Sequence, residues 1–302
     1  MTTLVFGANG QVGTELLRAL AADGAVQAIT RSGQLPDGSA CEVADFDAPQ
    51  TLTSLLDRIG PSRVVNAAAY TAVDRAEQDR DGALRANATS PCVIAAWCAS
   101  NNVPLVHYST DYVFDGQGTA PYPEDAHTSP LGVYGETKLA GEEAIRASGA
   151  QHLILRTAWV YASHGANFLR TMLRVGTERD ELRVVADQVG TPTPAALIAD
   201  VTAQLLRQLT PDTSGIWHLT AAGQTSWHGF AEAIFQQAVG AGLLPHAPRV
   251  VPITTADYPT PATRPAYSRL SIDKLQREFD IVLPDWQLGL QRVIAEIAAA
   301  RE

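Results

Sequence analysis

Two hydrophobic periods alternate along the first half of the chain. Short, nearly continuous apolar runs are separated by longer stretches in which apolar residues recur every three or four positions. The runs are TLVFGA, AVQAIT, RVVNAA, PLVHYST and HLILRTAWV. Strands that are apolar throughout are typical of a parallel sheet covered by helices on both faces, with right-handed crossovers. The pattern predicts an α/β fold with a doubly wound parallel sheet.

The pattern loosens after about residue 160, where helical segments mix with short strands. The helical segments are NFLRTMLRVG, AALIADVTAQLLRQL, WHGFAEAIFQQAVGAG and a final helix at about 286–301, and IWHLT is one of the strands. A connector rich in proline and threonine spans residues 251–271, and we expect it to be extended because each proline disfavours helix at the preceding residue. We expect a second, smaller α/β domain over residues 161–302, with elements of about 182–220 returning to the first.

The first apolar run ends in GANGQVG, which spaces Gly7, Gly10 and Gly13 as Gly-x-x-Gly-x-x-Gly. Glycines at these positions let the backbone turn tightly and approach a pyrophosphate at the start of a helix. Such a triplet is weak evidence alone, because a plain turn also contains glycine, but here it follows a strand and opens an amphipathic helix. We therefore predict a dinucleotide-binding (Rossmann) domain over residues 1–160 and a substrate domain over 161–302.

The end of the second predicted strand bears on the choice of cofactor. An acidic residue about 20 positions after the glycine loop indicates NAD, whereas an arginine suits the extra phosphate of NADP. The chain reads AITRSG at this place, and Arg31 can pair with a 2′-phosphate through a charge-assisted hydrogen bond. A solvated surface arginine is the alternative interpretation. The sequence favours NADPH, with NADH as the alternative cofactor.

Candidate catalytic residues lie in two segments. VYGETKLAGE places Tyr134 and Lys138 four positions apart, on one face of a helix, and VHYSTDYVFDG places Thr110 where a strand leaves the sheet. We expect a nearby ammonium and a cationic nicotinamide to lower the pKa of Tyr134. The phenol can then protonate a carbonyl oxygen as hydride arrives, with Thr110 bonded to the same oxygen. An exposed helix edge is the alternative for the pair alone.

These motifs together resemble the extended short-chain dehydrogenase/reductases. The likeness is carried by the glycine loop and by NAAAYTAVDRAE, STDYVFDG, YGETKLAGE, RTAWVY and DQVGTPT, and it continues to TRPAYSRL near residue 270. The resemblance implies an NAD(P)H-dependent reduction of the C4 ketone of dTDP-4-dehydro-L-rhamnose to dTDP-L-rhamnose, for surface polysaccharide. A reductase or epimerase of another nucleotide sugar, or a non-catalytic regulatory subunit of the same fold, are the alternatives.

The resemblance also assigns roles to individual residues. It implies a catalytic set of Thr110, Tyr134 and Lys138. Together with the glycine loop and Arg31, it gives the cofactor contacts as Gly7, Gly10, Gln11, Val12, Gly13, Arg31, Asp45, Phe46, Ala69, Tyr70, Thr71, Tyr108, Tyr134 and Lys138. The substrate contacts are Thr110, Asp111, Tyr112, Trp159 and Arg264. Asn87 resembles a helix asparagine that holds a water near the lysine.

A homodimer is a further implication of the resemblance, and in some relatives magnesium bridges it through carboxylates on surface helices. Glu15 and Glu296 stand at matching places, but Ala195 and Ala196 follow DQVGTPT where a glutamate is expected. Mg²⁺ prefers oxygen ligands, so the loss of one carboxylate weakens such a site. The sequence therefore argues against a metal-dependent dimer, and we assign no metal ligands.

Composition excludes several other classes. The 302 residues include 22 Lys and Arg and 32 Asp and Glu, a net charge of −10, which argues against a nucleic-acid or anionic-membrane surface. Three cysteines are too few for a disulfide framework and lack metal-ligand spacing. A basic leader and a long apolar run are both missing from the sequence, so we expect a cytoplasmic protein.

Overall fold

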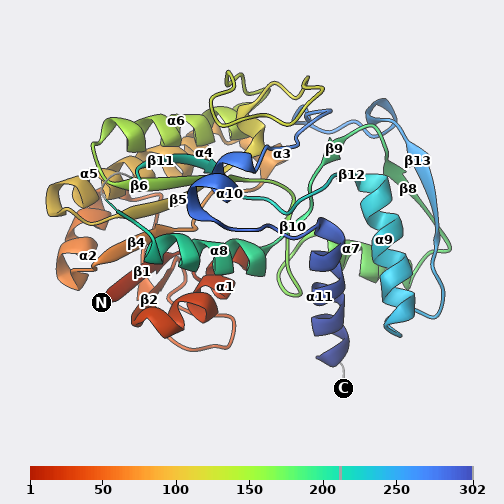
Figure 1. The fold of residues 1–302 in the computed structure, drawn as a ribbon, viewed down its shortest axis with the longest axis horizontal. Helices are drawn as coiled ribbons and strands as arrows, with labels where there is room; N and C mark the ends of the chain where they lie inside the picture. The colour runs from red at the N-terminus through yellow and green to blue at the C-terminus, as the bar shows by residue number, and fades with distance from the viewer. Residues whose placement is uncertain (211–212, 301–302) are drawn as a thin grey trace.

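A parallel sheet of seven strands forms the centre of the structure, a computed structural model that describes residues 1–210 and 213–300 (Figure 1). In chain order the strands are β1 (Thr2–Phe6), β2 (Ala25–Thr30), β3 (Glu42–Val43), β4 (Arg63–Asn66), β5 (Leu105–Thr110), β6 (His152–Thr157) and β11 (Gly215–His218). Across the sheet their order is β11-β6-β5-β4-β1-β2-β3, with parallel pairing throughout. The predicted doubly wound sheet is confirmed, and its order reverses between β1 and β4, where such sheets bind ligands.

Helices cover both faces of this sheet because successive side chains of a strand point to opposite faces. Val5 and Val106 pack into one core, whereas their neighbours Leu4 and Leu105 pack into a core on the other face. The first core is closed by α1 (Gln11–Leu20), α8 (Ala195–Arg207) and α10 (Asp273–Phe279), and the second by α2 (Leu52–Ile59), α5 (Ser90–Asn101) and α6 (Val133–Ala147). Of the helices in the described part of the chain, none combines the length and apolar character needed to cross a membrane.

Short helical elements connect these layers. They are η1 (Ala21–Asp23), η2 (Pro49–Thr51), α3 (Val73–Ala76), α4 (Arg80–Leu84), the π-helical turn η3 (Arg85–Thr89), η4 (Asp111–Val113) and η5 (Thr255–Asp257). The π turn joins α4 directly to α5, so residues 80–101 run as one helix with a widened turn in the middle. Such insertions commonly accompany functional sites, because they move side chains out of regular helical register.

A second lobe lies at the right of Figure 1 and has its own core, built around Tyr161, Phe230, Trp286 and Leu290. Its helices and strands are β7 (Val160–Tyr161), α7 (Phe168–Gly176), β8 (Glu181–Val185), β9 (Val189–Gly190), β10 (Thr193–Pro194), β12 (Thr225–Ser226), α9 (Trp227–Gly240), β13 (Arg249–Ile253) and α11 (Trp286–Ala299). The strands pair in twos, β13 with β8, β10 with β7 and β12 with β9.

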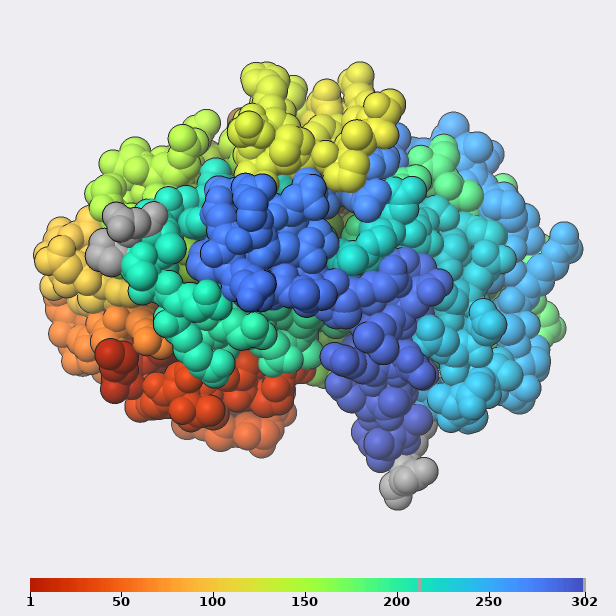
Figure 2. Space-filling view, viewed as in Figure 1, coloured from red at the N-terminus to blue at the C-terminus, as the bar shows by residue number. Residues whose placement is uncertain are grey.

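The chain returns to the central sheet after entering the second lobe. α8 packs against α1, and β11 adds to the sheet edge beside β6. α10 then covers β11, because the indole of Trp217 lies 5.5 Å from the ring of Phe279. Figure 2 shows the blue C-terminal residues lying against the green-teal residues of this returning segment. Within the segment 182–220 it is α8 and β11 that return, whereas β8 pairs with β13; the division at residue 160 stays a prediction.

Candidate active site

A cavity of about 940 Å³ runs along the carboxyl edge of the sheet. Its lining includes most of the residues that the sequence singled out, from the glycine loop at one end to β6 at the other. They are Gly7, Gly10, Gln11, Val12, Arg31, Asp45, Phe46, Ala69, Tyr70, Thr71, Tyr108, Thr110, Asp111, Tyr112, Tyr134, Lys138 and Trp159. Two predicted residues, Gly13 and Arg264, lie outside this lining. One cavity therefore unites the proposed cofactor and substrate contacts.

The glycine loop leaves the start of α1 open toward the cavity. Gly7 has a φ of +73°, and a Cβ there would lie 2.6 Å from the backbone nitrogen of Ala68. A Cβ on Gly13 would lie 2.0 Å from the oxygen of Gly7, so Gly13 allows the helix to pack closely against the loop. Gly10, the N-cap, provides no side-chain cap for α1. The first N–H groups of this helix are thus left for an anionic ligand, which fits the diphosphate of a dinucleotide.

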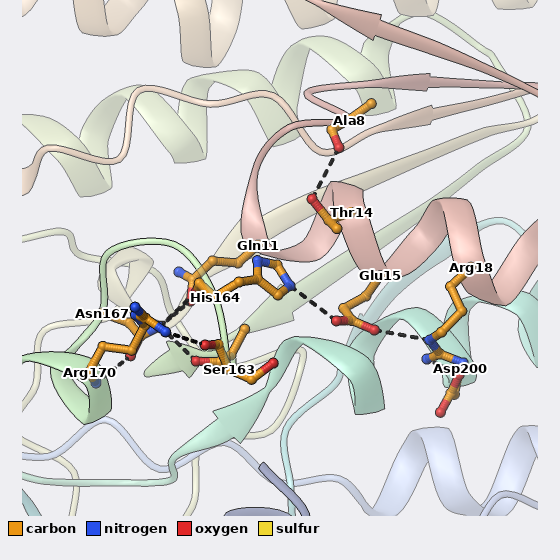
Figure 3. Close-up of polar contacts among 11 residues, drawn as sticks. Ala8, Gln11, Thr14, Glu15, Arg18, Ser163, His164, Asn167, Arg170 and Asp200 are labelled. Carbon is orange, nitrogen blue, oxygen red and sulfur yellow. Dashed lines mark hydrogen bonds and ion pairs between the residues drawn. The ribbon is translucent and has the colours of Figure 1, made fainter. Parts of the chain in front are cut away.

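The segment 162–167 lies beside the start of α1 and is held there by polar contacts (Figure 3). Asn167 Nδ2 donates to Gln11 Oε1 at 2.8 Å and to the oxygen of Ala162 at 2.9 Å. The same amide caps α7, since its oxygen accepts from the N–H of Arg170 at 3.0 Å. Gly165, within this segment, lines the cavity. Hydrogen bonds of Asn167 therefore hold this segment next to the loop that is expected to bind pyrophosphate.

Glu15, on the outer side of the same helix, is already engaged. Its carboxylate lies 3.1 Å from His164 Nε2 and 3.0 Å from Arg18 Nε (Figure 3). In the described ranges 1–210 and 213–300, no three or more His, Cys, Asp or Glu side chains gather in a way that could hold a metal ion. The homodimer stays a prediction, and the sequence had already placed its bridging by magnesium in doubt.

Two arginines and two aspartates surround the far end of the cavity. Arg31 Nε lies 3.2 Å from Asp45 Oδ1, and its Nη2 also pairs with Asp47. Arg85, from the π turn, places its Nε 3.3 Å from the other oxygen of Asp47. All four side chains line the cavity beside Phe46. Arg31 is thus an ion-paired arginine on the cavity wall whose side chain is 69% exposed, and its binding of a phosphate stays a prediction.

Glycines bring the helix that carries Tyr134 and Lys138 close to its neighbours. A Cβ on Gly135 would lie 2.2 Å from the oxygen of Tyr112, and one on Gly141 would lie 2.1 Å from the oxygen of Asn87. The start of α6 is capped from a distant segment, because Glu77 Oε1 accepts from the N–H of Val133 at 2.9 Å. The two glycines in YGETKLAGE are explained by this close packing against η4 and η3.

Burial governs the acidity of Tyr134. Removal from water raises the pKa of its hydroxyl, the nearby Asp111 raises that pKa further, and a hydrogen bond with Thr110 opposes the shift. The sequence had suggested a lowered pKa, on the basis of a lysine and a charged nicotinamide. In the chain by itself the opposite direction results, since desolvation is the larger effect.

The hydroxyl of Thr110 is directed at its neighbour. Its Oγ1 donates to Asp111 Oδ1 at 2.9 Å and accepts from the N–H of Tyr112 at 3.2 Å. Asp111 is 2% exposed, and burial raises the pKa of its carboxyl to about 6, although the bond from Thr110 opposes this. Ser109 Oγ and Thr157 Oγ1, which also line the cavity, are buried and make no hydrogen bond to any described residue. The carboxyl end of β5 therefore presents a dense group of polar atoms.

Lys138 is a buried amine, only 2% exposed. Its Nζ donates to the oxygen of Tyr108 at 2.6 Å and lies 3.3 Å from His107 Nε2. Burial lowers the pKa of Lys138 to about 8, with the carboxylate of Glu142 acting in the other direction. Both N–H donors of Asn87 are used elsewhere, one on the oxygen of Tyr70 at 3.2 Å and one on Thr137 Oγ1 at 3.1 Å. The side-chain donors of Asn87 are thus used within the protein, and the water expected near this residue stays a prediction.

An aromatic stack forms the wall shared with the second lobe. The rings of Trp159 and Trp227 are 3.6 Å apart and inclined by only 5°. Trp159 has a φ of +49°, a left-handed conformation that is unusual for a bulky residue. Gly190 permits this placement, because a Cβ there would lie 2.5 Å from the indole of Trp159. The indole is therefore fixed where it meets the cavity.

Arg264 stands beside this cavity rather than on its wall. Its Nη2 lies 2.6 Å from Asp74 Oδ2, and its Nη1 donates to Tyr112 Oη at 3.4 Å. Asp74 also accepts from the N–H of Ala262 at 3.1 Å. The connector 251–271 is thereby tied to α3, and Arg264 is neither solvated nor free.

Comparison with known proteins gives a consistent result. The family model described as RmlD substrate binding domain matches residues 1–299. A dTDP-4-dehydrorhamnose reductase from Shigella flexneri is 47% identical over 301 residues, covering 98% of each chain. The chain belongs to the dTDP-4-dehydrorhamnose reductase family. A crystal structure of a dTDP-4-dehydrorhamnose reductase from Bacillus anthracis in complex with NADP superimposes with a TM-score of 0.88, at 32% identity, and covers 98% of this chain and 99% of that one.

A relative named for a different activity is also similar to this reductase-family chain. It is a probable dTDP-4,6-dihydroxy-2-methyloxan-3-one 4-ketoreductase from Streptomyces antibioticus, 38% identical over 302 residues, 99% of this chain and 97% of the relative. Both relatives are named as reductases of dTDP-linked or related keto sugars. The identity of the sugar is therefore the finer question within this part of the reductase family.

Sequence reasoning missed several residues that shape this reductase-family site. Asp74 and Glu77 stand inside the motif NAAAYTAVDRAE, so their acidic side chains could have been noticed there. Arg85, His107 and Trp227 gave no local signal, because each acts through a partner far away in the chain.

Proposed function

We propose that this chain reduces the C4 ketone of dTDP-4-dehydro-L-rhamnose to dTDP-L-rhamnose, with NADPH as the reductant. The observation that carries the proposal is the placement of Thr110, Tyr134 and Lys138 around the same cavity that the glycine loop enters. The reductase from Shigella flexneri, similar over nearly the whole length, supports the same activity. The reaction converts a ketone, a hydride and a proton into a secondary alcohol.

NADPH, when bound, supplies the hydride to the carbonyl carbon of the sugar. Tyr134 Oη gives its proton to the carbonyl oxygen, so that the alcohol forms without a free alkoxide. Thr110 donates a hydrogen bond to the same oxygen after turning its hydroxyl away from Asp111. Lys138, on the same face of α6 as Tyr134, stabilises the tyrosinate that remains. Each role is assigned to the protein's own side chains.

The preference for NADPH is proposed to come from Arg31 and Arg85 together. Both guanidiniums reach Asp47, so that carboxylate holds two cations at the end of the cavity expected to take the adenosine. A 2′-phosphate carries acceptor oxygens that such a pair can bind with charge-assisted hydrogen bonds. Asp45, beside Arg31, offers an acceptor for a ribose hydroxyl and keeps NADH as a weaker alternative.

The substrate side of the site is proposed to use Asp111, Tyr112, Trp159 and Arg264. Trp159 presents a fixed aromatic face, which suits stacking on a ring of the substrate. Arg264, held by Asp74, is positioned for the diphosphate of the nucleotide sugar, which a guanidinium can bind with two donors. On binding, the diphosphate would replace the carboxylate of Asp74 as the anionic partner of Arg264.

Steady-state assays with a substrate panel test this function. The purified chain is mixed with NADPH and, separately, with dTDP-4-dehydro-L-rhamnose, its C5 epimer and a UDP-linked 4-keto sugar, and NADPH oxidation is followed. We expect rapid oxidation with the first compound and much slower oxidation with the others. Faster turnover of another sugar would reassign the substrate. NADPH binding without oxidation by any ketone would favour the non-catalytic regulatory subunit.

A further inference from the structure

Three buried polar side chains, those of Asn66, His107 and Lys138, lie in hydrogen-bonding contact one after another. Asn66 and His107 belong to the central sheet, and Lys138 belongs to α6. Asn66 is the last residue of β4, and His107 is its paired neighbour in β5. The side chains of Asn66, His107 and Lys138 are 1%, 0% and 2% exposed. Asn66 Nδ2 lies 3.0 Å from His107 Nδ1, and His107 Nε2 lies 3.3 Å from Lys138 Nζ. The imidazole of His107 therefore links the side-chain amide of Asn66 to the amine of Lys138.

The backbone determines which atom of Asn66 faces the histidine. Asn66 Oδ1 accepts from the N–H of Ala68 at 3.1 Å, and an N–H group has only a hydrogen to give. The amide NH₂ is thus the group that faces His107 Nδ1, and Nδ1 must accept. Burial and the neighbouring Lys138 lower the pKa of His107 well below its ordinary value, so the ring is neutral. A neutral ring whose Nδ1 accepts carries its proton on Nε2.

In this tautomer, the group of His107 that faces Lys138 is the Nε2–H donor. An ammonium offers three donors and no acceptor, whereas a neutral amine offers a lone pair. One hydrogen of Nζ is used by the oxygen of Tyr108 at 2.6 Å. The Nε2–H of His107 therefore forms a good hydrogen bond with the neutral amine of Lys138 and a poor one with its ammonium form. The same contact distinguishes the two protonation states of the lysine.

We propose that His107 is a positioning residue that disfavours the ammonium form of Lys138, so that Lys138 gives up and regains a proton near neutral pH. A lysine that binds its proton less tightly returns one more readily to the tyrosinate left on Tyr134 after turnover. The proposal rests on the proposed function of Lys138 and Tyr134.

Other groups around Lys138 leave this assignment intact. Glu142, one turn further along α6, favours the ammonium, but its carboxylate is bound by the buried guanidinium of Arg156 at 2.7 Å. Asp111 lies near Tyr134, and its charge raises the pKa of Tyr134. The lowered pKa of Lys138, about 8, agrees with an environment that disfavours its charge.

Nuclear magnetic resonance of the imidazole nitrogens tests the tautomer in the free enzyme, without cofactor or substrate. We expect the signals of His107, assigned by their loss in His107→Gln, to report a proton on Nε2 and none on Nδ1. A proton on Nδ1 overturns the proposal. Because this readout needs no turnover, it fails or succeeds independently of the proposed reductase activity.

The pH dependence of kcat/KM gives the second test. Reduction needs the Lys138 ammonium to stabilise tyrosinate, so activity falls as pH rises through the pKa of Lys138. His107→Leu removes the opposing donor, and Asn66→Asp makes Nδ1 a donor and turns Nε2 into an acceptor. We expect both variants to move the alkaline limb upward by about one pH unit.

A matched control separates this effect from loss of packing. His152 is a histidine at the start of β6, buried and bonded to the oxygen of Ala150 at 2.8 Å. His152→Leu removes a similar ring from the amino end of the neighbouring strand, away from Lys138, and its alkaline limb should stay where the wild type has it. If His107→Leu and Asn66→Asp lower kcat but leave the limb unmoved, the two residues are structural and the proposal is wrong.

Discussion

Arg156 and Glu142 form an ion pair with two hydrogen bonds inside the protein, behind the proposed catalytic helix. Arg156 Nε and Nη2 lie 2.9 and 2.7 Å from the two carboxylate oxygens, and the side chains are 3% and 1% exposed. The guanidinium also donates to the oxygen of Glu124 at 3.2 Å and lies 5.1 Å from the centre of the Phe114 ring. The pair joins β6 to α6, so it fixes the helix that carries Tyr134 and Lys138.

Glu142→Gln should therefore destabilise the fold strongly. The substitution leaves the Arg156 guanidinium buried without its counter-charge, and breaking a buried pair in this way costs roughly 3–5 kcal/mol. Urea unfolding measures the change in the free energy of unfolding. Glu178→Gln is the matched control, because Glu178 pairs with Arg174 on the surface and such pairs contribute about 0.5 kcal/mol or less. Equal unfolding midpoints for the two variants would contradict this account.

Asp111→Asn should stabilise the protein, and the gain should depend on pH. The pKa of Asp111 is about 6 in the folded chain and 3.8 ordinarily, so the folded state binds this proton more tightly than the unfolded state. Wild-type stability is then lost as pH rises from about 4 to about 6 and is level above that. An asparagine cannot ionise and keeps an acceptor for Thr110. We expect the variant to gain at most roughly 3 kcal/mol at pH 7 and little at pH 4.

Urea unfolding of the Asp111→Asn variant and the wild type at both pH values measures this difference. A gap between the two proteins that is the same at pH 4 and pH 7 would show that ionisation of Asp111 has no part in it.

Tyr134→Phe should abolish most turnover while cofactor binding persists. The variant lacks the proton donor, and loss of a general acid typically reduces the rate about 10²–10⁴-fold. Fluorescence titration with NADPH should give a dissociation constant within about twofold of the wild type, because the aromatic ring stays in place. Tyr258→Phe, at an exposed position, serves as the control. Rates close to the wild type in Tyr134→Phe would refute the assignment.

Arg31→Ala and Arg85→Leu should each weaken discrimination between the two cofactors. Each removes one cation from the pair that Asp47 holds, and a charge-assisted hydrogen bond contributes about 1.5–3 kcal/mol. We expect KM for NADPH to rise about tenfold or more while KM for NADH changes little. An equal rise in KM for both cofactors would mean that the arginines support the adenosine end of the site without binding the 2′-phosphate.

Trp227→Ala should impair use of the nucleotide sugar without affecting NADPH. The ring of Trp227 lies flat against that of Trp159, so the substitution leaves the indole of Trp159 without its stacking partner. The backbone of Trp159 has an unusual φ of +49°. We expect KM for the sugar to rise several-fold, and Trp227→Phe to restore most of the loss by keeping an aromatic surface. An unchanged KM in Trp227→Ala would remove Trp159 from the substrate contacts.

The central fold could be predicted because its information is local. Strands β1, β4, β5 and β6 each contain a run of apolar residues and are buried over nearly their whole length, and the glycine loop follows the first of them directly. The candidate catalytic residues could be proposed for the same reason, since Tyr134 and Lys138 lie four positions apart, on one face of a helix. In contrast, β7 and β12 have two residues each and carry no periodic signal.

The properties that escaped sequence reasoning depend on tertiary contacts. The raised pKa of Tyr134 follows from burial, which no neighbouring residue in the chain announces. The ion pair of Arg264 with Asp74 joins residues that lie 190 positions apart in the sequence, and the stack of Trp159 on Trp227 is also a contact between distant segments. Sequence pattern identified the chemical groups of the site, and the fold determined how each is tuned.

The late arrival of β11 has a consequence for biosynthesis. β6 pairs with it on the outer side of the sheet, and α10 supplies its cover. A nascent chain that has left the ribosome only as far as β6 therefore exposes an unpaired strand edge, which is a template for aggregation. The central sheet and its helical cover are therefore complete only once β11 and α10 have been synthesised, after most of the second lobe.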